Sequence, residues 1–347
     1  MDLSDLEWKE FFVEKIYNDP KRGKRLKKED HIEGDIPYVS SSSFNNGVDS
    51  FIGNEHNVRK YKDCLSLANS GSVGSCFYEP FEFIASDHIT HLKGEYTPQQ
   101  YLFMAGMLNR LAEKYNFNRE INDMRISREK IMLPVDESGN PDFKFMEQYV
   151  KKIEKEKMKK YLIYCKKALA SLDDVILLKP FSEIEWKPYI IGKIAKVDSG
   201  RDIYDAERVD GDLPYITAGV QNNGIGYFVG NINNTITKNA ISVSRNGAGV
   251  GSSFYHEYPA LYSNDCRKVV LNDYSENKFV SLFITNQIMI QRKNYNYSRK
   301  MGTERLKKQK IMLPAIDEEN PDYEYMEQYI KNIMIKKYKD YIAYAEK

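Results

Sequence analysis

The chain has 347 residues, a formal net charge of +1, 26 tyrosines and four cysteines. No apolar run approaches the roughly 20 residues of a membrane span, and the N-terminus has no signal-peptide pattern, so we expect a cytoplasmic protein without a membrane partner. Cys64, Cys76, Cys165 and Cys266 form no CxxC pair, which favours free thiols over disulfides or zinc. Because the net charge is nearly neutral, any nucleic-acid binding must depend on local clusters of cations.

Residues 1–142 predict one mixed α/β domain. Short strands are indicated at residues 36–39, 64–68 and 81–85, which lie between turns rich in Gly, Asn and Ser. An apolar face over residues 101–115 predicts a helix.

A long helix rich in Lys and Glu is predicted next, from about residue 143 to residue 170, and residues 143–178 form this spacer helix and a linker. Pro141 and Asp142 are typical of a helix start. Residues 179–322 repeat the plan of the first domain, with a matching helix over residues 278–291. Residues 323–347 then predict a second spacer helix.

The two halves are a tandem duplication. Residues 130–151 and 310–331 are identical at 13 of 22 positions, with an offset of 180. Weaker matches extend this duplication over the whole chain. A period this long is that of a domain and not of a solenoid repeat. A duplicated recognition domain implies a target with two parts.

Each spacer helix carries one apolar stripe. We predict that the two helices pack on each other, antiparallel and with a pseudo-two-fold axis, because neither buries its stripe alone; the alternative is that each packs on its own domain. A rod of roughly 40 Å is close to one turn of duplex DNA, about 34–36 Å. The predicted packing residues are Met146, Tyr149, Ile153, Tyr161, Cys165, Met326, Tyr329, Ile333, Tyr341 and Ala345.

Four groups of residues are candidates for DNA contact, because phosphates attract Lys and Arg, and base edges also bond Asn, Gln, Ser and Thr. Two are basic: a turn around a glycine in each half, and a loop where aromatic residues alternate with cations. The alternatives are a solvated turn and aromatic side chains that pack under the helix. The turn supplies Lys21, Arg22, Lys24, Arg25, Lys27, Lys28, Arg201 and Arg208. The loop, which begins at Tyr115 or Tyr295 and includes Phe117 or Tyr297, supplies Arg119, Arg125, Arg128, Arg299, Lys300, Arg305 and Lys307.

The other two groups are polar. One follows the Pro-Tyr strand and differs between the halves, which suits two different half-sites; the alternative is a hydrogen-bonded turn. It supplies Ser41, Ser42, Asn45, Asn46, Thr217, Gln221, Asn222 and Asn223. The last group is the pair Arg245 and Asn246.

Motifs for catalysis are incomplete. The segment Asp35-Ile-Pro-Tyr38 lacks the first proline of the turn with which adenine methyltransferases grip a flipped base. Gly247-Ala-Gly-Val-Gly251 lacks the helix and the acidic residue of a dinucleotide site. The pair His88-x-x-His91 has no counterpart in the second half. We therefore expect no catalytic residue, no metal site and no cofactor in this chain.

Taken together, these motifs resemble the specificity (S) subunits of type I restriction–modification systems, and among them most those of type IIB (BcgI-like) enzymes. The resemblance covers essentially the full chain. The residues that carry it are Leu133-Pro134, Glu147-Gln148 and Trp8-Lys9 with their repeats, and the strand Gly34-Asp-Ile-Pro-Tyr38 with its repeat.

The resemblance implies two target recognition domains that each read one half of a bipartite site in double-stranded DNA. It also implies helices that dock a methyltransferase or a fused methyltransferase–nuclease, which methylates adenine N6, cleaves, or does both. S-adenosylmethionine and Mg²⁺ would then belong to that partner. The alternative is a non-catalytic pair of β-rich domains on a helical rod that binds protein or glycan.

Overall fold

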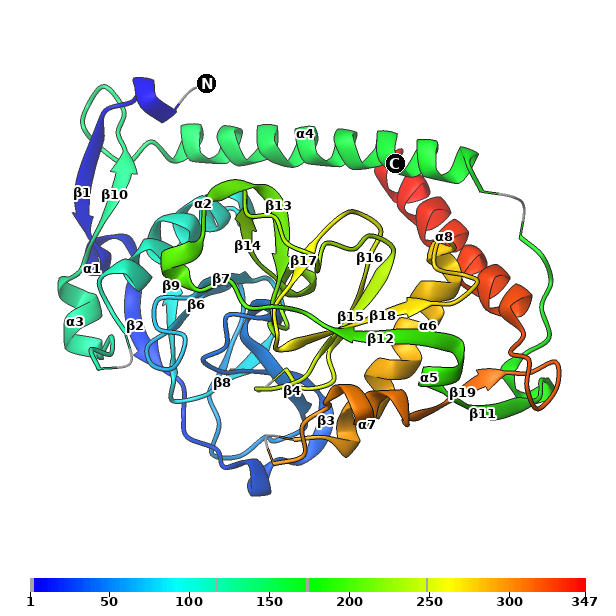
Figure 1. The fold of residues 1–347 in the computed structure, drawn as a ribbon. Coiled ribbons are helices and arrows are strands. Elements are labelled where there is room, and N and C mark those ends of the chain that lie inside the picture. The colour runs from blue at the N-terminus through cyan, green and yellow to red at the C-terminus, as the bar shows by residue number, and fades with distance from the viewer. Residues whose placement is uncertain (1–2, 117, 173–174, 248, 297) are drawn as a thin grey trace. The chain divides into compact units, whose positions relative to one another are not determined.

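A computed structural model describes residues 3–116, 118–172, 175–247, 249–296 and 298–347 (Figure 1). Contacts divide the chain into two compact units, Met1–Tyr161 (unit 1) and Leu162–Lys347 (unit 2). Each unit contains mixed sheets, short helices and helices longer than 10 residues. The predicted fold class, a duplicated mixed α/β domain with long helices, is confirmed.

Unit 1 is built on two sheets that cover different parts of its core. One has the strand order β2–β9–β6–β7 and the other the order β4–β3–β8–β5. The strands of the first sheet are β2 (Asn18–Arg22), β9 (Ile89–Lys93), β6 (Cys64–Ala68) and β7 (Cys76–Glu79). Those of the second are β4 (Val48–Ile52), β3 (Glu33–Val39), β8 (Phe83–Ala85) and β5 (Lys60–Tyr61).

Unit 2 repeats this topology. Its sheets have the orders β12–β18–β15–β16 and β14–β13–β17. The strands of the first are β12 (Ala195–Ser199), β18 (Cys266–Leu271), β15 (Ala240–Ser244) and β16 (Ser253–His256). Those of the second are β14 (Ile225–Val229), β13 (Asp210–Ile216) and β17 (Leu261–Tyr262). A bridge between Thr237 and Ala260 lies beside β17.

The first and last strands of each domain pair with each other. In unit 1, β1 (Trp8–Phe12) runs antiparallel to β10 (Lys130–Pro134), with Trp8 opposite Pro134. In unit 2, β11 (Trp186–Ile190) and β19 (Lys310–Pro314) repeat the register, with Trp186 opposite Pro314. The duplicated Lys-Ile-Met-Leu-Pro segment is therefore the strand that closes each domain before its long helix.

A repeated pair of glycines explains another part of the duplication. A Cβ on Gly34 would lie 2.5 Å from the Cα of Gly53, and a Cβ on Gly211 would lie 2.5 Å from the Cα of Gly230. Two backbones touch at both places, so only glycine fits without a shift of the main chain.

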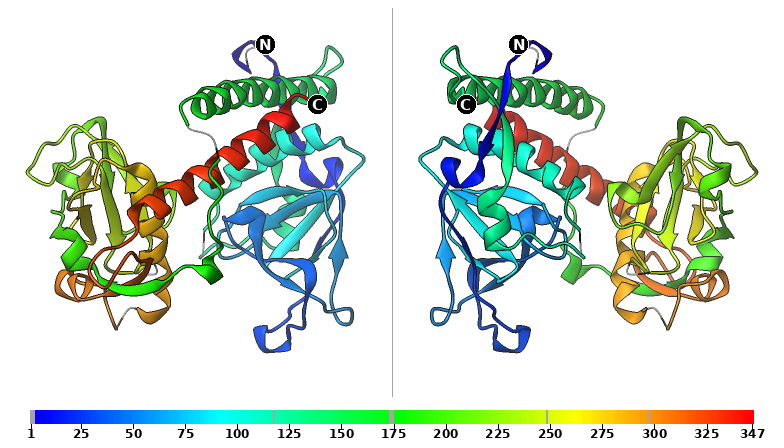
Figure 2. Two further views of the ribbon diagram at one scale, coloured as in Figure 1. Left: turned by 90° about the vertical axis from the view of Figure 1, so that its right-hand side faces the viewer. Right: turned by 90° about the vertical axis from the view of Figure 1, so that its left-hand side faces the viewer.

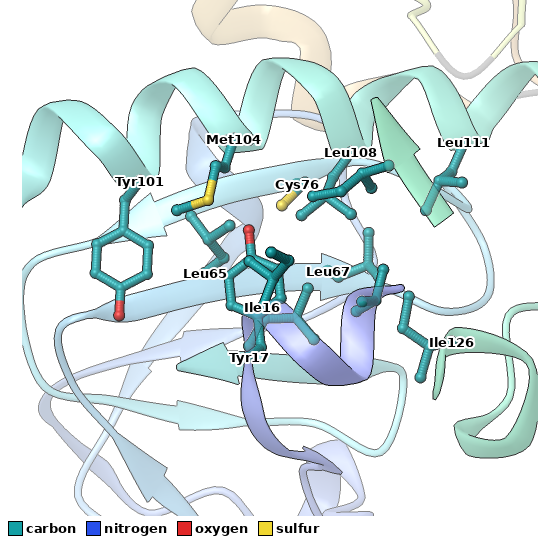
Figure 3. Close-up of a cluster of buried hydrophobic side chains, with 14 of the residues drawn as sticks. Ile16, Tyr17, Leu65, Leu67, Cys76, Tyr101, Met104, Leu108, Leu111 and Ile126 are labelled. Atoms are coloured by element: carbon teal, nitrogen blue, oxygen red, sulfur yellow. The ribbon is translucent and has the colours of Figure 1, made fainter. Parts of the chain in front are cut away.

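An apolar helix covers the first sheet of each unit. Helix α2 (Pro98–Leu108) lies on the sheet of unit 1 and α6 (Lys278–Ile290) on that of unit 2 (Figure 2). In Figure 3, Tyr101, Met104 and Leu108 of α2 point toward Leu65 and Leu67 of β6, and all five are at most 2% exposed. The sheet and its helix thus form the hydrophobic core of each unit.

Shorter helices connect these elements. The α-helical ones are α1 (Val13–Ile16), α3 (Asp123–Arg128), α5 (Ile191–Ile194) and α7 (Thr303–Lys307). Turns of 3₁₀-helix occur at Leu3–Asp5, Lys28–Asp30, Asn45–Gly47, Asn109–Glu113, Phe181–Glu183, Asp205–Glu207, Asn222–Gly224 and Gln291–Asn294.

Two long helices follow the closing strands, α4 (Phe143–Ala170) and α8 (Tyr323–Ala345). Asp142 and Asp322 cap them, because their carboxylates accept the amides of Phe145 at 2.8 Å and Tyr325 at 2.9 Å.

The first turns of both helices pack on their own units. Met146 is fully buried in the core of unit 1, against which Tyr149 also packs, and Met326 and Tyr329 do the same in unit 2. The alternative interpretation, packing on the helix's own domain, therefore describes these four side chains. Each long helix begins over the apolar helix of its own domain, and the predicted role of these four residues in helix-to-helix packing stays a prediction.

The last turns of α4 belong to unit 2 and contact α8. Tyr164 and Tyr338 lie with ring centroids 6.0 Å apart, and Lys166 pairs with Glu346 at 2.6 Å. Cys165, which lies between Tyr164 and Lys166 in the sequence, is buried. Ile153, Tyr341 and Ala345 are half-buried, whereas Tyr161 and Ile333 are exposed. The antiparallel arrangement of the two rods stays a prediction.

No helix in the described part of the chain is long and apolar enough to cross a membrane. The four cysteines are free thiols, as predicted, and all of them are buried.

Candidate nucleic-acid interface

A glycine turn carries the basic residues of unit 1 past the edge of its sheet. A Cβ on Gly23 would lie 2.1 Å from the carbonyl oxygen of Ala85. Gly200 lies against the carbonyl oxygen of Tyr262 in the same way, at 2.2 Å. The recurrence of glycine therefore has a steric cause, and the side chains around the turn are free to differ between units.

Most cations of this turn are exposed. Lys21 and Lys27 pair with acidic neighbours at 3.5 and 3.3 Å, and Arg22 donates to a backbone carbonyl at 3.4 Å. Such surface pairs are weak and can be exchanged for phosphate oxygens. The remaining exposed cations of the turns are Lys24, Arg25, Lys28 and Arg201.

Arg208, further along the turn of unit 2, is held more firmly. Its guanidinium carbon lies 3.7 Å from the ring centroid of Tyr227, and its Nη1 lies 2.6 Å from the carboxylate of Asp205. His31 occupies the matching position of unit 1 and packs edge-on against Tyr38 at 4.8 Å. The Nε of Arg208 and the Nε2 of His31 are buried, and neither has a partner among the described residues.

The variable polar segment is a hydrogen-bonded turn in both units. The amide of Thr217 donates to the carbonyl of Gly224 at 2.7 Å, and the matching bond in unit 1 is 2.9 Å long. Asn46 and Asn223 have φ angles of 52° and 53°, in the left-handed region that asparagine tolerates. The backbone interpretation as a turn is confirmed, and contact with bases stays a prediction. The exposed side chains are Asn45, Asn46, Gln221, Asn222 and Asn223, and the half-buried ones are Ser41, Ser42 and Thr217.

Arg245 is paired with Asp265. One Nη of Arg245 lies 3.0 Å from the Asp265 carboxylate, and Asn246 beside it has a buried amide oxygen without a partner among the described residues. Arg267 lies close by, is 4% exposed, and donates to the hydroxyl of Ser199 at 2.6 Å. Burial, and after it the charge of Arg245, lowers the pKa of Arg267, although arginine stays protonated. Two guanidinium groups are thus concentrated at one end of the sheet.

In the aromatic and basic loop, the tyrosines pack inward, as one interpretation expected, and the arginines are exposed, as the other requires. Arg119 lies over the ring of Tyr115 at 5.1 Å and Arg299 over that of Tyr295 at 5.6 Å. Both tyrosine rings are buried and their hydroxyls donate to Glu129 and Gln309, so the aromatics pack inward while the arginines are exposed. Phe117 and Tyr297 lie outside the described residues. The other predicted cations of these loops are Arg125, Arg128, Lys300, Arg305 and Lys307.

Two hollows of unit 2 gather several predicted residues. One, of about 370 Å³, is lined by Arg208, Thr217, Tyr227, Ser263 and Asp265, and so joins the glycine turn to the variable segment. The other, of about 550 Å³, is lined largely by cations of the loop. Its charged lining residues are Arg299, Glu304, Arg305, Lys308 and Lys310.

As possible DNA contacts, sequence reasoning missed Asp265 and Arg267, as well as His31 and His88. Each is a polar or charged side chain at a position where the two halves differ. A position-by-position comparison of the halves, restricted to polar residues next to strand ends, is the signal that would have found them.

The remaining motifs have structural roles. Gly247 and Gly251 have φ angles of 73° and 80°, in the left-handed region that glycine adopts readily in turns. His91 is buried, stacks on Tyr61 at 3.9 Å and bonds the carbonyl of Lys21. Among the described residues, no three His, Cys, Asp or Glu side chains gather in a way that could hold a metal ion.

These features belong to a known class of protein. The sequence matches the family described as type I restriction modification DNA specificity domain over residues 5–163 and again over residues 183–342. The chain therefore belongs to this family and contains two such domains. It is a non-catalytic, DNA-recognising specificity subunit of a restriction–modification system, as the repeated residues predicted.

Among individual proteins, the chain is similar to the specificity subunit S.BcgI of a type II restriction enzyme from Heyndrickxia coagulans. The two are 29% identical over 301 residues, which cover 86% of each chain. The fold is also similar to a type I restriction–modification S subunit from M. genitalium, with a TM-score of 0.47 and 16% identity over 100% of this chain and 94% of that one. For the HsdS subunit from Thermoanaerobacter tengcongensis the values are 0.34 and 12%, over 98% and 90%.

Proposed function

We propose that each unit reads one half of a bipartite site in double-stranded DNA, and that the chain positions a partner methyltransferase, alone or fused to a nuclease, at that site. The partner methylates adenine N6, cleaves the DNA, or does both. S-adenosylmethionine and Mg²⁺ bind to the partner and not to this chain.

One observation supports the proposal above the others: the same backbone frame occurs twice with different polar side chains. The glycine turn, the asparagine turn and the closing strand pair recur, but Arg208 and Arg245 of unit 2 are replaced by His31 and Asn69 in unit 1. Two equal frames with unequal donors and acceptors suit two different half-sites.

The cations divide into two groups by their exposure. Those of the glycine turns and of the aromatic loops project into solvent, where they suit contacts with phosphates, which position a protein without selecting a sequence. Arg208 and Arg245 are held by acidic partners, and such fixed side chains suit contacts with base edges. DNA binding should therefore weaken steeply with salt even though the net charge is only +1.

The outer surface of α4 supports a role in docking the partner subunits. Met158 and Tyr161, which are three residues apart and so lie on one face of α4, are 37 and 46% exposed. Apolar side chains grouped on one helix mark a surface for another protein. The alternative function, binding of protein or glycan by the two domains, is not favoured, because both domains belong to a DNA specificity family.

The decisive experiment maps methylated adenines in the DNA of cells that express this chain together with its partner methyltransferase. Modification at one split sequence, lost when the chain is omitted, is the expected result. Methylation at the same sites without the chain would overturn the proposal.

A further inference from the structure

The same backbone hydrogen bond occurs within each unit, at a point where the side chains of the two units differ. The amide of Arg245 donates to the carbonyl of Asp265 at 2.8 Å, and in unit 1 the amide of Asn69 donates to the carbonyl of His88 at 2.9 Å. The carbonyls of Arg245 and Asn69 also accept matching amides, at 3.1 and 2.9 Å. Because the frame is the same, the side chains at this point can be compared directly.

In unit 2 this point presents a guanidinium. The side chain of Arg245 is 27% exposed and is paired with Asp265, whose side chain is 44% exposed. The Nε of Arg245 is buried and has no acceptor in the described part of the chain, so an acceptor from outside can reach the guanidinium only through its Nη atoms. A guanidinium already fixed by a carboxylate also loses little freedom when it binds.

In unit 1 the same point presents an imidazole. Asn69 is fully buried and its amide nitrogen donates inward to the hydroxyl of Thr90 at 3.2 Å. The side chain of His88 is 53% exposed instead, and its Nδ1 shares a short hydrogen bond with the hydroxyl of Ser70. In unit 2 the exposed side chain thus belongs to Arg245, which donates the backbone hydrogen bond. In unit 1 it belongs to His88, which accepts it.

The other arginines near Arg245 fit base contact less well. Arg267 is 4% exposed and its Nη1 already donates to three acceptors. Arg208 is covered on one face by Tyr227. Arg208 and Arg245 are both fixed by a carboxylate, but the side chain of Arg245 is the more exposed, at 27% against 22%.

We propose that Arg245, oriented by Asp265, reads the edge of a guanine in the half-site of unit 2, and that His88 is the matching specificity residue of unit 1. Guanine presents N7 and O6 as two acceptors in the major groove, and the fork of an arginine fits both. This inference rests on the proposed function, because it requires that each unit reads its own half-site.

The test uses the complex of the full chain with its methyltransferase and selects binders from a library of random DNA duplexes. The wild type should enrich a split sequence with a guanine at one position of one half. Arg245→Lys keeps the charge but loses the fork, so preference for that guanine should fall roughly 5- to 100-fold while the other half-site is unchanged. Asp265→Asn should lower the same preference by less, and His88→Ala should relax the other half-site only.

The outcomes separate the two proposals. If the wild type enriches no split sequence, the proposed function fails. If it does, and Arg245→Lys keeps the guanine or loses affinity equally for all sequences, Arg245 is a phosphate contact and the inference fails. A half-site without guanine overturns it as well. Retention of the other half-site in each variant shows that the complex remains folded.

Discussion

Units 1 and 2 have equivalent backbone hydrogen bonds, but different polar side chains are buried at matching positions. At the end of β7, the carboxylate of Glu79 accepts from the hydroxyl of Ser66 at 2.8 Å. At the matching end of β16, the imidazole of His256 bonds the hydroxyl of Ser242 at 2.9 Å. An acid and a base thus fill one buried position of the same frame.

This difference teaches that the frame depends on backbone contacts and apolar packing, while polar positions can change their chemistry. The serine hydroxyl on the neighbouring strand can donate or accept, so it suits a carboxylate in one unit and an imidazole in the other. A recognition domain built in this way can acquire a new half-site without a new fold.

Each unit also contains one tryptophan, which allows the two to be measured separately. Trp8 stacks on Phe103 in unit 1, and Trp186 stacks on Phe283 in unit 2, both at 6.3 Å. In a Trp186→Phe background the fluorescence reports unit 1, and in a Trp8→Phe background it reports unit 2.

The largest expected effect tests whether the two cores are independent. Leu108 and Ile288 occupy matching positions of α2 and α6, and both are fully buried. Leu108→Ala should destabilise unit 1 by about 2–5 kcal/mol and leave unit 2 unchanged, and Ile288→Ala should do the reverse. Urea unfolding of each tryptophan background measures this. Loss of stability in both units from one substitution would show that they unfold together.

The second prediction concerns the shared glycine pairs. Gly34→Ala and Gly211→Ala each place a methyl group 2.5 Å from a backbone carbon of Gly53 or Gly230, so each should cost its own unit about 3 kcal/mol. Gly106→Ala is the control, since nothing lies within 4 Å of its Cβ and alanine favours the helix by about 1 kcal/mol. Equal stability of Gly34→Ala and Gly106→Ala would contradict the close backbone contact.

The exchange of Glu79 for His256 predicts opposite pH dependence. Burial raises the pKa of Glu79 from 4.5 to about 7, so folded unit 1 holds a proton that the unfolded chain has released, and its stability falls as pH rises from 4.5 to 7. Burial lowers the pKa of His256 from 6.5 to about 4. The unfolded chain then binds the extra proton, and the stability of unit 2 falls as pH drops from 6.5 to 4.

Urea unfolding at pH 5 and pH 7 checks this prediction, with an expected change on the order of 2 kcal/mol in each unit. Glu79→Gln should remove from unit 1 the loss of stability with rising pH and leave the opposite dependence of His91, whose pKa is lowered by burial. His256→Gln should remove most of the dependence from unit 2. The same direction of change in both units would refute the assignment of these two groups.

Local patterns in the sequence predicted much of the fold. The expected strand at residues 64–68 is β6 (Cys64–Ala68), and the expected helix at residues 278–291 is α6 (Lys278–Ile290). The pairing of β1 with β10 was not predicted, because it joins segments more than 100 residues apart. The packing of Met146 on its own domain was not predicted for a related reason. An apolar stripe shows that a helix face is buried but does not identify the surface that buries it.

The candidate interface was predicted less completely. Exposed cations such as Arg299 stand out in a sequence because they cluster. Arg267 was missed because a cation in a strand gives no sign that its partners, among them Ser199, come from another strand. The pairing of Arg245 with Asp265 likewise depends on strand order, which a single sequence does not contain.

The smallest predicted effect concerns a feature that the units share without change. Asp142 and Asp322 cap α4 and α8 with bonds of 2.8 and 2.9 Å, and the turns that they cap hold Met146 and Met326 in the cores. Asp142→Ala and Asp322→Ala should therefore each cost about 1 kcal/mol, in unit 1 and unit 2 respectively, whereas both Asp→Asn variants should retain most of the stability because asparagine caps nearly as well. Urea unfolding in the two tryptophan backgrounds measures both pairs. A loss of stability in one unit alone would mean that the long helices begin differently in the two units. The structural equivalence of the units would then be contradicted where their sequences are most alike.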